Sequence, residues 1–257
     1  SEAETSLSGD SVQTQPTVEN LTSTTLSIPA TTTTAPVESI TVPKTTRPST
    51  TTTTSLVETL DKPFYAATAI NTMLEAFKKQ TDSEPKWLLS NPGPFKGERV
   101  LLIRKIEEDW VQVLMPIRRH GTLAWVERDS VSITEHKAKV IVDKYSGVLE
   151  GWRNGELLFR EAFISGSDEH PTPLGDFYIN EINSGGDEMS GEILVGITAF
   201  STSMDSTSEG DPAIAFLENN LEEGSGELGT RGCIRVSKKV LNLLAGLPLG
   251  TPVQIVG

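Results

Sequence analysis

The stretch KVIVDKYSGVLEGWRNGELLFREAFI, residues 139–164, decides the fold class because it holds three strand-like segments separated by two short turns. The segments cover residues 139–142, 147–152 and 156–164, and they are rich in the Val, Ile, Leu and Phe residues typical of strands. The turns are Tyr145-Ser146-Gly147 and Arg153-Asn154-Gly155. Asn-Gly between two such segments is a strong hairpin signal. This part of the chain is therefore predicted to form a mostly antiparallel sheet.

The rest of the C-terminal half continues the same pattern. Further strands are predicted at residues 177–182, 193–200 and 251–256. Before the last of them, Ser237 is the expected N-cap of a short helix, Lys238 to Ala245, and Gly246 follows its end. Residues 138–257 are therefore expected to form a mainly β domain with one short helix.

A second, smaller β unit is predicted upstream. Short strands are expected at residues 99–104, 110–114 and 122–126. The segment 69–77 fits either one face of a helix or a strand. Short strands about every ten residues, with turn residues between them, favour a small SH3-like β-barrel. We place it at residues 64–135, followed by a polar link at residues 134–137.

The N-terminal residues have a composition that does not support a folded core. Residues 1–60 contain 19 Thr, 9 Ser and 5 Pro and no aromatic residue. Such a segment cannot bury enough apolar surface to offset the entropy of ordering it. Residues 1–62 are therefore predicted to be a disordered tether with a reach of roughly 45 Å. It suits a stalk that holds a domain away from a membrane surface, and a tail without a spatial role remains the alternative.

Charge and composition exclude several classes of function. The net charge is −13, of which −9 belongs to the residues after position 60. This acidity argues against non-specific binding to nucleic acid or anionic lipid. The chain has no run of about 18 apolar residues, so no membrane span is expected. We also expect no metal and no cofactor, since neither metal-ligand spacing nor a phosphate-binding loop is present. Two of the histidines, His120 and His136, are expected to face solvent.

The single cysteine, Cys233, lies in the segment GTRGCIRV, residues 229–236. If the segment is extended, Arg231, Cys233 and Arg235 share one face, and two cations beside a thiol favour the reactive thiolate. Gly232 permits close approach of a ligand and exposes backbone N–H groups, as an oxyanion site requires. We therefore predict a partly exposed, reactive thiol with a lowered pKa.

Three segments together resemble the catalytic domain of L,D-transpeptidases, the YkuD fold. They are GTRGCIRV at residues 229–236, HPTPLGDF at residues 170–177 and LPLGTPV at residues 247–253. The upstream residues 110–126 are similar to the small domain that precedes this catalytic domain in actinobacterial members. The resemblance implies a YkuD-like β-sandwich with one short helix at residues 138–257.

The resemblance implies an enzyme of cell wall biogenesis, and hence of cell shape, which acts outside the cytoplasm on the stem peptides of peptidoglycan. Cys233 matches the nucleophile that attacks the third residue of the stem and releases the terminal D-Ala. Gly232 would supply an oxyanion N–H, and Arg231, Arg235 and Asn220 would contact substrate. Carbapenems, which acylate the cysteine of active members, are expected inhibitors.

One position departs from the family pattern. The family base is a His in a His-Gly-Thr-Asn-like block, 16 residues before the Cys in the actinobacterial pattern, and a gapless alignment places Leu217 there. Leucine cannot accept a proton, so three alternatives stay open. The arginines alone ionise Cys233 in a slower enzyme, His170 or Glu218 replaces the base, or catalysis is lost and the domain binds peptidoglycan or scaffolds other wall enzymes. We expect a transpeptidase slowed by the missing His.

Overall fold

The structure is a computed structural model that describes residues 62–94, 96–183, 193–206, 210–219 and 230–257. The predicted tether at residues 1–62 lies outside these residues except for its last position. The described part is mainly β, with one α-helix among its residues, so the predicted fold class is confirmed. No described helix has the length and apolar character that a membrane crossing requires.

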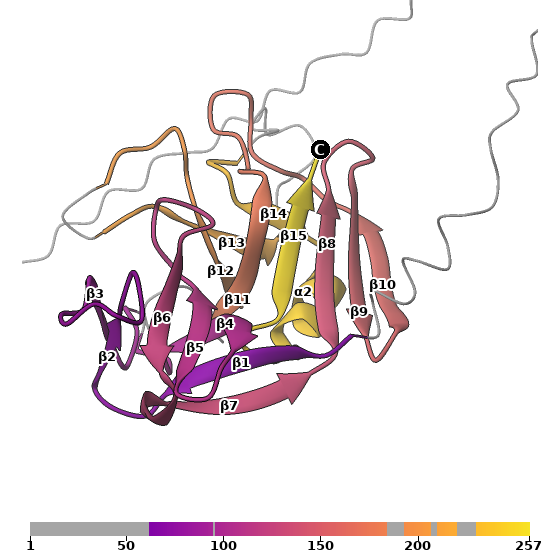
Figure 1. The fold of residues 1–257 in the computed structure, drawn as a ribbon. Helices are drawn as coiled ribbons and strands as arrows, with labels where there is room; N and C mark the ends of the chain where they lie inside the picture. Colours follow the sequence, from indigo (N-terminus) through magenta and orange to yellow (C-terminus); the bar gives the residue numbers. More distant parts are fainter. Residues whose placement is uncertain (1–61, 95, 184–192, 207–209, 220–229) are drawn as a thin grey trace, which may run out of the picture. The chain divides into compact units, whose positions relative to one another are not determined.

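The first sheet has five strands in the order β6-β5-β4-β1-β7, and all neighbours are antiparallel (Figure 1). Its strands are β1 (Phe64–Ala69), β4 (Val100–Ile106), β5 (Trp110–Leu114), β6 (Leu123–Glu127) and β7 (Val131–His136). A separate hairpin pairs β2 (Met73–Ala76) with β3 (Trp87–Ser90), so the ambiguous segment at 69–77 contains a strand. A short 3-10 turn, η1 (Arg128–Ser130), precedes β7. The predicted link at 134–137 is wrong for its first three residues, which belong to β7.

The second sheet has eight strands in the order β10-β9-β8-β15-β11-β12-β13-β14. Its strands are β8 (Ala138–Asp143), β9 (Val148–Arg153), β10 (Glu156–Ala162), β11 (Gly175–Asn183), β12 (Leu194–Phe200), β13 (Ala213–Glu218), β14 (Ile234–Val236) and β15 (Pro252–Val256). The pairs β13–β14 and β15–β8 are parallel, and the other neighbours are antiparallel. The predicted hairpin turn joins β9 to β10, with positive φ at both Asn154 and Gly155. Whether residues 64–135 and 138–257 act as separate domains stays a prediction.

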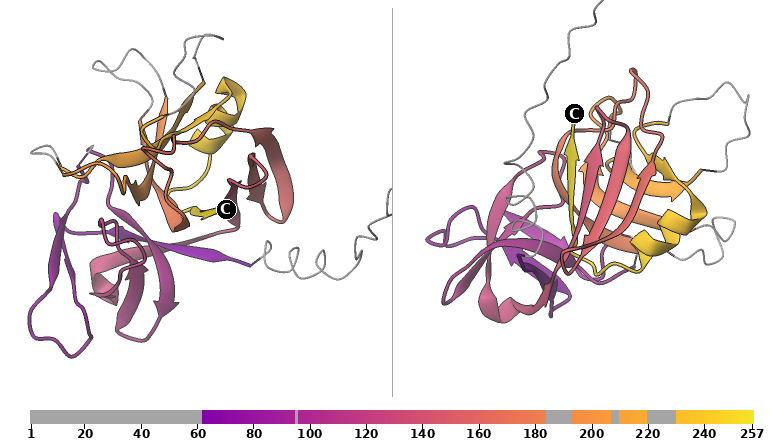
Figure 2. Two further views of the ribbon diagram at one scale, coloured as in Figure 1. Left: turned by 90° about the horizontal axis from the view of Figure 1, so that it is seen from above. Right: turned by 90° about the vertical axis from the view of Figure 1, so that its right-hand side faces the viewer.

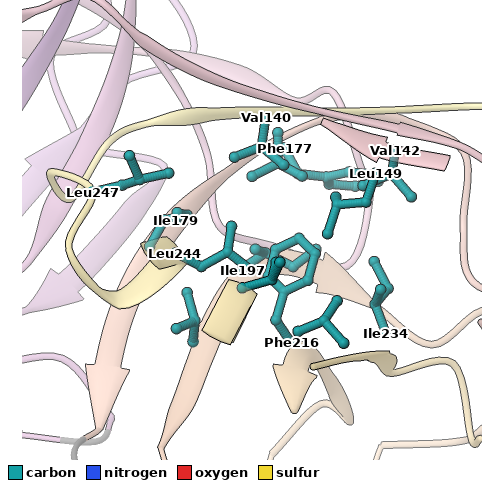
Figure 3. Packing of buried hydrophobic residues seen from close by; sticks show 14 of the residues in the cluster. Val140, Val142, Leu149, Phe177, Ile179, Ile197, Phe216, Ile234, Leu244 and Leu247 are labelled. Atoms are coloured by element: carbon teal, nitrogen blue, oxygen red, sulfur yellow. The ribbon is translucent and has the colours of Figure 1, made fainter. Parts of the chain in front are cut away.

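The helix α2 (Lys238–Ala245) begins where the sequence predicts it. The Val240 N–H donates to the hydroxyl of the N-cap Ser237, 3.3 Å away, and Glu161 of β10 accepts from both the amide and the hydroxyl of Ser237. The helix contacts β10 near one end of the sheet and β12 and β13 near the other, so the sheet curves around it (Figure 2). Its buried residues join the core shown in Figure 3, with Phe177, Ile197 and Phe216 of the strands.

Strand β11 contributes to the cores of both sheets because successive side chains point to opposite faces. Phe177 packs into the core of the eight-stranded sheet, whereas the next residue, Tyr178, packs with the five-stranded sheet. Close backbone approach adds to this contact, since a Cβ at Gly250 would lie 2.5 Å from the Ala66 Cβ. The two sheets are therefore joined by side chains of one strand.

The expectation that His120 and His136 face solvent is wrong. The Nε2 atom of His120 accepts the Phe200 N–H at 2.9 Å, and the Nδ1 atom of His136 accepts the Ala138 N–H at 3.2 Å. Burial lowers the pKa of both imidazoles, so both rings favour the neutral state. Both residues lie where the two sheets adjoin. The charged residues around them in the sequence gave no indication that these two rings would be partly buried.

Candidate active site

The candidate nucleophile lies in a tight turn just before β14. The Thr230 hydroxyl donates to the Cys233 carbonyl and closes the turn. Gly232 has φ +102°, a conformation that L residues with a side chain rarely adopt. A Cβ at this position would also lie 2.6 Å from the Ile214 Cδ1. The turn therefore requires glycine before the cysteine, and it places the Cys233 thiol in a half-buried position.

A buried threonine holds this turn from the other side. Thr172 is 1% exposed, donates its hydroxyl to the Gly232 carbonyl at 2.9 Å and accepts the Gly166 N–H at 2.9 Å. A Cβ at Gly166 would lie only 2.0 Å from the His170 carbonyl and 2.9 Å from the Gly232 Cα. The HPTP segment therefore packs directly on the nucleophile turn. Neither Thr172 nor Gly166 was among the predicted site residues, although Thr172 lies within the quoted motif.

The side chain of Arg235 lies on the same face of β14 as the thiol. Ile234 and Val236 are buried in the core, so the alternating residues Cys233 and Arg235 point to the opposite face. The Nη1 atom of Arg235 donates to the Glu218 carbonyl of β13 at 2.9 Å. Arg231 is exposed. The prediction that Arg231 shares a face with Cys233 assumed an extended strand, and the positive φ at Gly232 interrupts that strand.

The predicted lowering of the Cys233 pKa is wrong in direction. Burial raises the pKa of the thiol, and this effect outweighs two that favour the thiolate: a hydrogen bond from the Ala215 backbone and the positive charge of Arg235. The thiol is therefore mostly protonated at neutral pH and needs a proton acceptor to react.

The register of β13 and β14 points to a position for the missing base other than the predicted Leu217. Phe216 pairs with Ile234 and Leu217 pairs with Arg235 in parallel, so Ala215 lies level with Cys233. The hydrogen bond from Ala215 to the thiol agrees with this register. Leu217 lies two residues after Ala215 on the same face of β13, which is roughly 7 Å further along the strand. By this register, the residue of β13 level with the thiol is Ala215 rather than Leu217.

His170 is close to the nucleophile turn through its backbone, while its ring is held elsewhere. Its carbonyl lies 3.9 Å from the Cβ position of Gly232, and its Nδ1 atom is 2.9 Å from the Ser203 hydroxyl. Its amide donates to the Ser167 hydroxyl at 3.2 Å, which fixes the start of the turn. The Nε2 atom has no described partner and is the one through which His170 could act. Asn220 lies outside the described residues.

The balance of effects on Cys233 predicts a distinct pH dependence of alkylation. Iodoacetamide labelling of the folded protein should reach half its maximal rate at a higher pH than labelling of the urea-unfolded chain, because burial favours the thiol. The Arg235→Ala variant should shift this midpoint further upward. The exposed Arg231→Ala is the matched control and should leave it unchanged. A midpoint below that of the unfolded chain would contradict this assignment.

The described residues contain no group of three or more His, Cys, Asp or Glu side chains placed to hold a metal ion. The chemistry available at this turn is thus that of a thiol, the backbone amides beside it and a neighbouring guanidinium. A thiol with amide donors next to it is compatible with covalent acyl transfer.

Comparison with known proteins gives one family match. Residues 137–255 match the model of the YkuD family, described as the L,D-transpeptidase catalytic domain. No curated protein sequence matches the chain. Similar solved structures include an L,D-transpeptidase from Stackebrandtia nassauensis, with 16% identity and a TM-score of 0.35 over 47% of this chain and 55% of that one. This chain therefore spans about half the length of that protein.

Two further structures are from Mycobacterium tuberculosis. L,D-transpeptidase 1 has 17% identity and a TM-score of 0.33, covering 52% of this chain and 77% of its own. L,D-transpeptidase 3 in complex with a faropenem-derived adduct has 15% identity and a TM-score of 0.37, covering 52% of this chain and 73% of its own. The family model rather than these overall similarities identifies the domain. Residues 137–255, just under half of the chain, thus match the YkuD family of L,D-transpeptidase catalytic domains.

Proposed function

We propose that this chain is a peptidoglycan L,D-transpeptidase that uses Cys233 as its nucleophile. The observation that carries the proposal is the nucleophile turn. A half-buried thiol follows a glycine whose carbonyl is tied to the buried Thr172, and both the Ala215 backbone hydrogen bond and the Arg235 cation favour the thiolate. A rigidly held thiol with donors around it is suited to attack on a carbonyl.

In the proposed reaction the Cys233 sulfur attacks the carbonyl carbon of the third stem residue. The C–N bond to the terminal D-Ala breaks, the thiol proton passes to the leaving amine, and a thioester remains on Cys233. The amine of a second stem then attacks the thioester, forms the new amide and returns a proton to the sulfur. The amides of Gly232 and Cys233 would stabilise the oxyanion in both steps. Arg231, Arg235 and Asn220 would contact the substrate.

The proton transfers need a base, and His170 is the candidate that the fold offers. Its backbone adjoins Gly232, and Ser203 holds its Nδ1 atom, which leaves Nε2 for proton transfer. Because burial keeps the thiol protonated, the reaction depends on this base, and a well-placed general base contributes on the order of 10²–10⁴ in rate. With its base on the HPTP segment rather than on β13, the proposed enzyme is slower than one that has an imidazole level with its cysteine.

The same proposal includes the place of action. Peptidoglycan stems lie outside the cytoplasm, so we assign the protein to the cell wall or the outer face of the membrane. Residues 1–62 would act there as a tether, and the function would be cell wall biogenesis with an effect on cell shape. The net charge of −9 after residue 60 fits a partner that carries free amines.

Incubation with a carbapenem followed by intact-mass measurement tests the nucleophile. The wild type should gain one carbapenem mass, and Cys233→Ala should gain none because the acylated atom is absent. Hydrolysis and exchange assays with a stem tetrapeptide should then show release of D-Ala by the wild type alone. An adduct of equal yield on Cys233→Ala would show that another residue is acylated.

A second candidate function is peptidoglycan binding without catalysis. The observation that favours it is Ala215, because the position level with the thiol carries a methyl group where proton transfer would need a base. In that case the wild type should co-sediment with isolated peptidoglycan and form neither an adduct nor free D-Ala. Adduct formation on Cys233 would exclude this candidate.

A further inference from the structure

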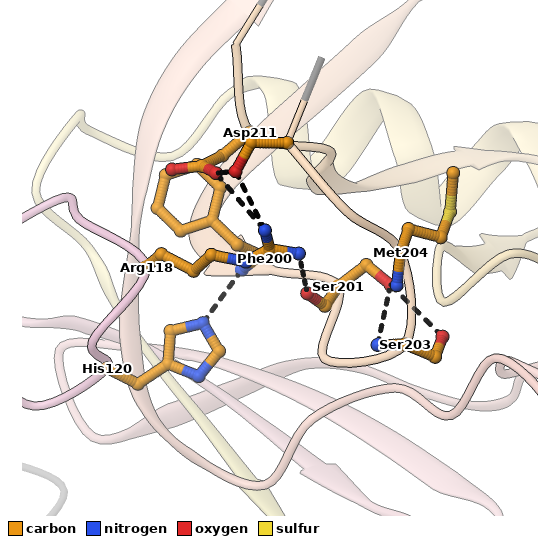
Figure 4. Close-up of polar contacts among 8 residues, drawn as sticks. Arg118, His120, Phe200, Ser201, Ser203, Met204 and Asp211 are labelled. Atoms are coloured by element: carbon orange, nitrogen blue, oxygen red, sulfur yellow. Dashed lines mark hydrogen bonds and ion pairs between the residues drawn. The ribbon is translucent and has the colours of Figure 1, made fainter.

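The loop between β5 and β6 reaches from the five-stranded sheet to the end of β12. Figure 4 shows its two contacting side chains, Arg118 and His120, facing the segment that begins at Phe200. The His120 ring accepts the Phe200 N–H and lies edge-on to Phe177, with ring centroids 5.0 Å apart. This loop therefore fixes the point where β12 ends.

Arg118 holds the residues that follow β12 at three places. Its Nη2 atom donates to the Ser201 carbonyl at 3.1 Å, and its Nη1 atom donates to the Ser206 hydroxyl at 2.8 Å. Nη1 also lies 3.5 Å from the Asp211 carboxylate, and the Ser206 hydroxyl donates to the same carboxylate. A planar guanidinium with several donors suits such a multiple contact better than a lysine ammonium does.

The fixed segment continues to His170. Ser201 is 1% exposed, and its hydroxyl accepts from the amides of Ser203 and Met204 at 3.4 and 3.3 Å. Its own amide donates to the Pro212 carbonyl at 2.8 Å. The Ser203 hydroxyl lies 2.9 Å from the His170 Nδ1. The orientation of the His170 ring thus depends on a serine whose backbone is folded around Ser201.

We propose that Arg118 is a positioning residue for the active site: it fixes Ser201 to Ser206, and through Ser203 it orients His170 beside the Cys233 turn. This inference rests on the proposed function, in which His170 exchanges the proton. It gives the five-stranded sheet a role in catalysis, since Arg118 belongs to that sheet's β5–β6 loop. The test measures the energetic coupling between Arg118 and the acylation of Cys233 directly.

The first experiment compares Arg118→Ala with Arg119→Ala. Arg119 is the matched control because it is the next residue of the same loop and is exposed, and its side chain forms no hydrogen bond or ion pair with a described residue. Hydrogen exchange of residues 200–206 should become faster in Arg118→Ala and stay unchanged in Arg119→Ala. The rate constant for acylation at saturating carbapenem should fall about tenfold in Arg118→Ala, because misplacement of a reacting group is costly. The half-saturating concentration should stay unchanged, and Arg118→Lys should recover part of the rate.

A double-mutant cycle with Ser203→Ala tests the route. Ser203 is exposed, so removal of its hydroxyl leaves folding intact and provides a result even if Arg118→Ala unfolds. Ser203→Ala should lower the acylation rate constant about tenfold, and the double variant should be little slower than either single variant. Fully additive losses, or a rate unchanged by Ser203→Ala, would overturn the proposal.

Failure of the proposed function gives a different pattern. If the wild type forms no adduct, the transpeptidase proposal fails, yet hydrogen exchange still reports whether Arg118 fixes residues 200–206. Faster exchange in Arg118→Ala with an unchanged acylation rate would refute the positioning role while leaving the proposed function intact. Unchanged exchange would refute the contact itself.

Discussion

The Gly166→Ala variant is expected to lose both stability and reactivity. The added Cβ would lie 2.0 Å from the His170 carbonyl and 2.9 Å from both the Gly232 Cα and the Thr172 amide nitrogen. All three are backbone atoms, so no flexible side chain can move aside. We expect the free energy of unfolding to fall by about 1–3 kcal/mol or more, as for an overpacked core. The acylation rate should fall more steeply, since the atoms that must shift form the nucleophile turn.

Gly97→Ala is the matched control for this variant. Gly97 has an ordinary φ, and a Cβ there would meet no atom within 4 Å. Its substitution should leave both the melting temperature and the carbapenem reaction near wild-type values, or stabilise the protein slightly by restricting the unfolded chain. Thermal unfolding and the rate of mass gain measure the two effects separately. Gly166→Ala with wild-type stability and a wild-type acylation rate would contradict the close packing described around Thr172.

The strands that the sequence revealed are those with bulky or alternating side chains. Residues 110–114 were predicted with the observed bounds, and the helix with its N-cap Ser237 was predicted correctly because capping and periodicity agree there. Strand β1 reads FYAATA and β13 reads AIAFLE, and their alanines weaken the strand signal. Both strands form because each pairs with a neighbouring strand on both sides. This pairing depends on the tertiary structure and cannot be predicted from the local composition.

The candidate site shows a similar division. The motif around Cys233 was enough to single out this turn as the candidate site, whereas the thiol pKa depends on burial, which the motif does not determine. The gapless alignment and the strand register place the missing base at different residues. An alignment counts residues along the chain from β13 to β14, whereas the hydrogen-bond register of the two strands decides which residue lies level with the thiol. A shift of two residues keeps a side chain on the same face of the sheet but moves it along the strand. Thr172 escaped prediction because its role depends on contacts 60 residues apart.

The Ala215→His variant is expected to accelerate acylation of Cys233 by tenfold or more. The register places position 215 level with the thiol and on the face opposite the core residues Ile214 and Phe216. A neutral imidazole there could take the thiol proton and pass it to the leaving amine. Tenfold corresponds to about 1.4 kcal/mol of transition-state stabilisation. The measurement is the rate of carbapenem adduct formation, together with D-Ala release from a stem tetrapeptide.

Two variants make this result specific. Ala215→Gln adds similar volume without a group that accepts a proton at neutral pH, so it should give no acceleration and controls for altered packing at a residue that is 6% exposed. Leu217→His places the same imidazole roughly 7 Å further along the strand, level with Arg235, and should accelerate the reaction less. A larger gain from Leu217→His than from Ala215→His would show that the base position follows the gapless alignment. A third outcome is that both histidine variants fold, as judged by thermal unfolding, but neither reacts faster than a wild type that already releases D-Ala. In that case proton transfer uses a residue outside β13, and His170 is the base to test next.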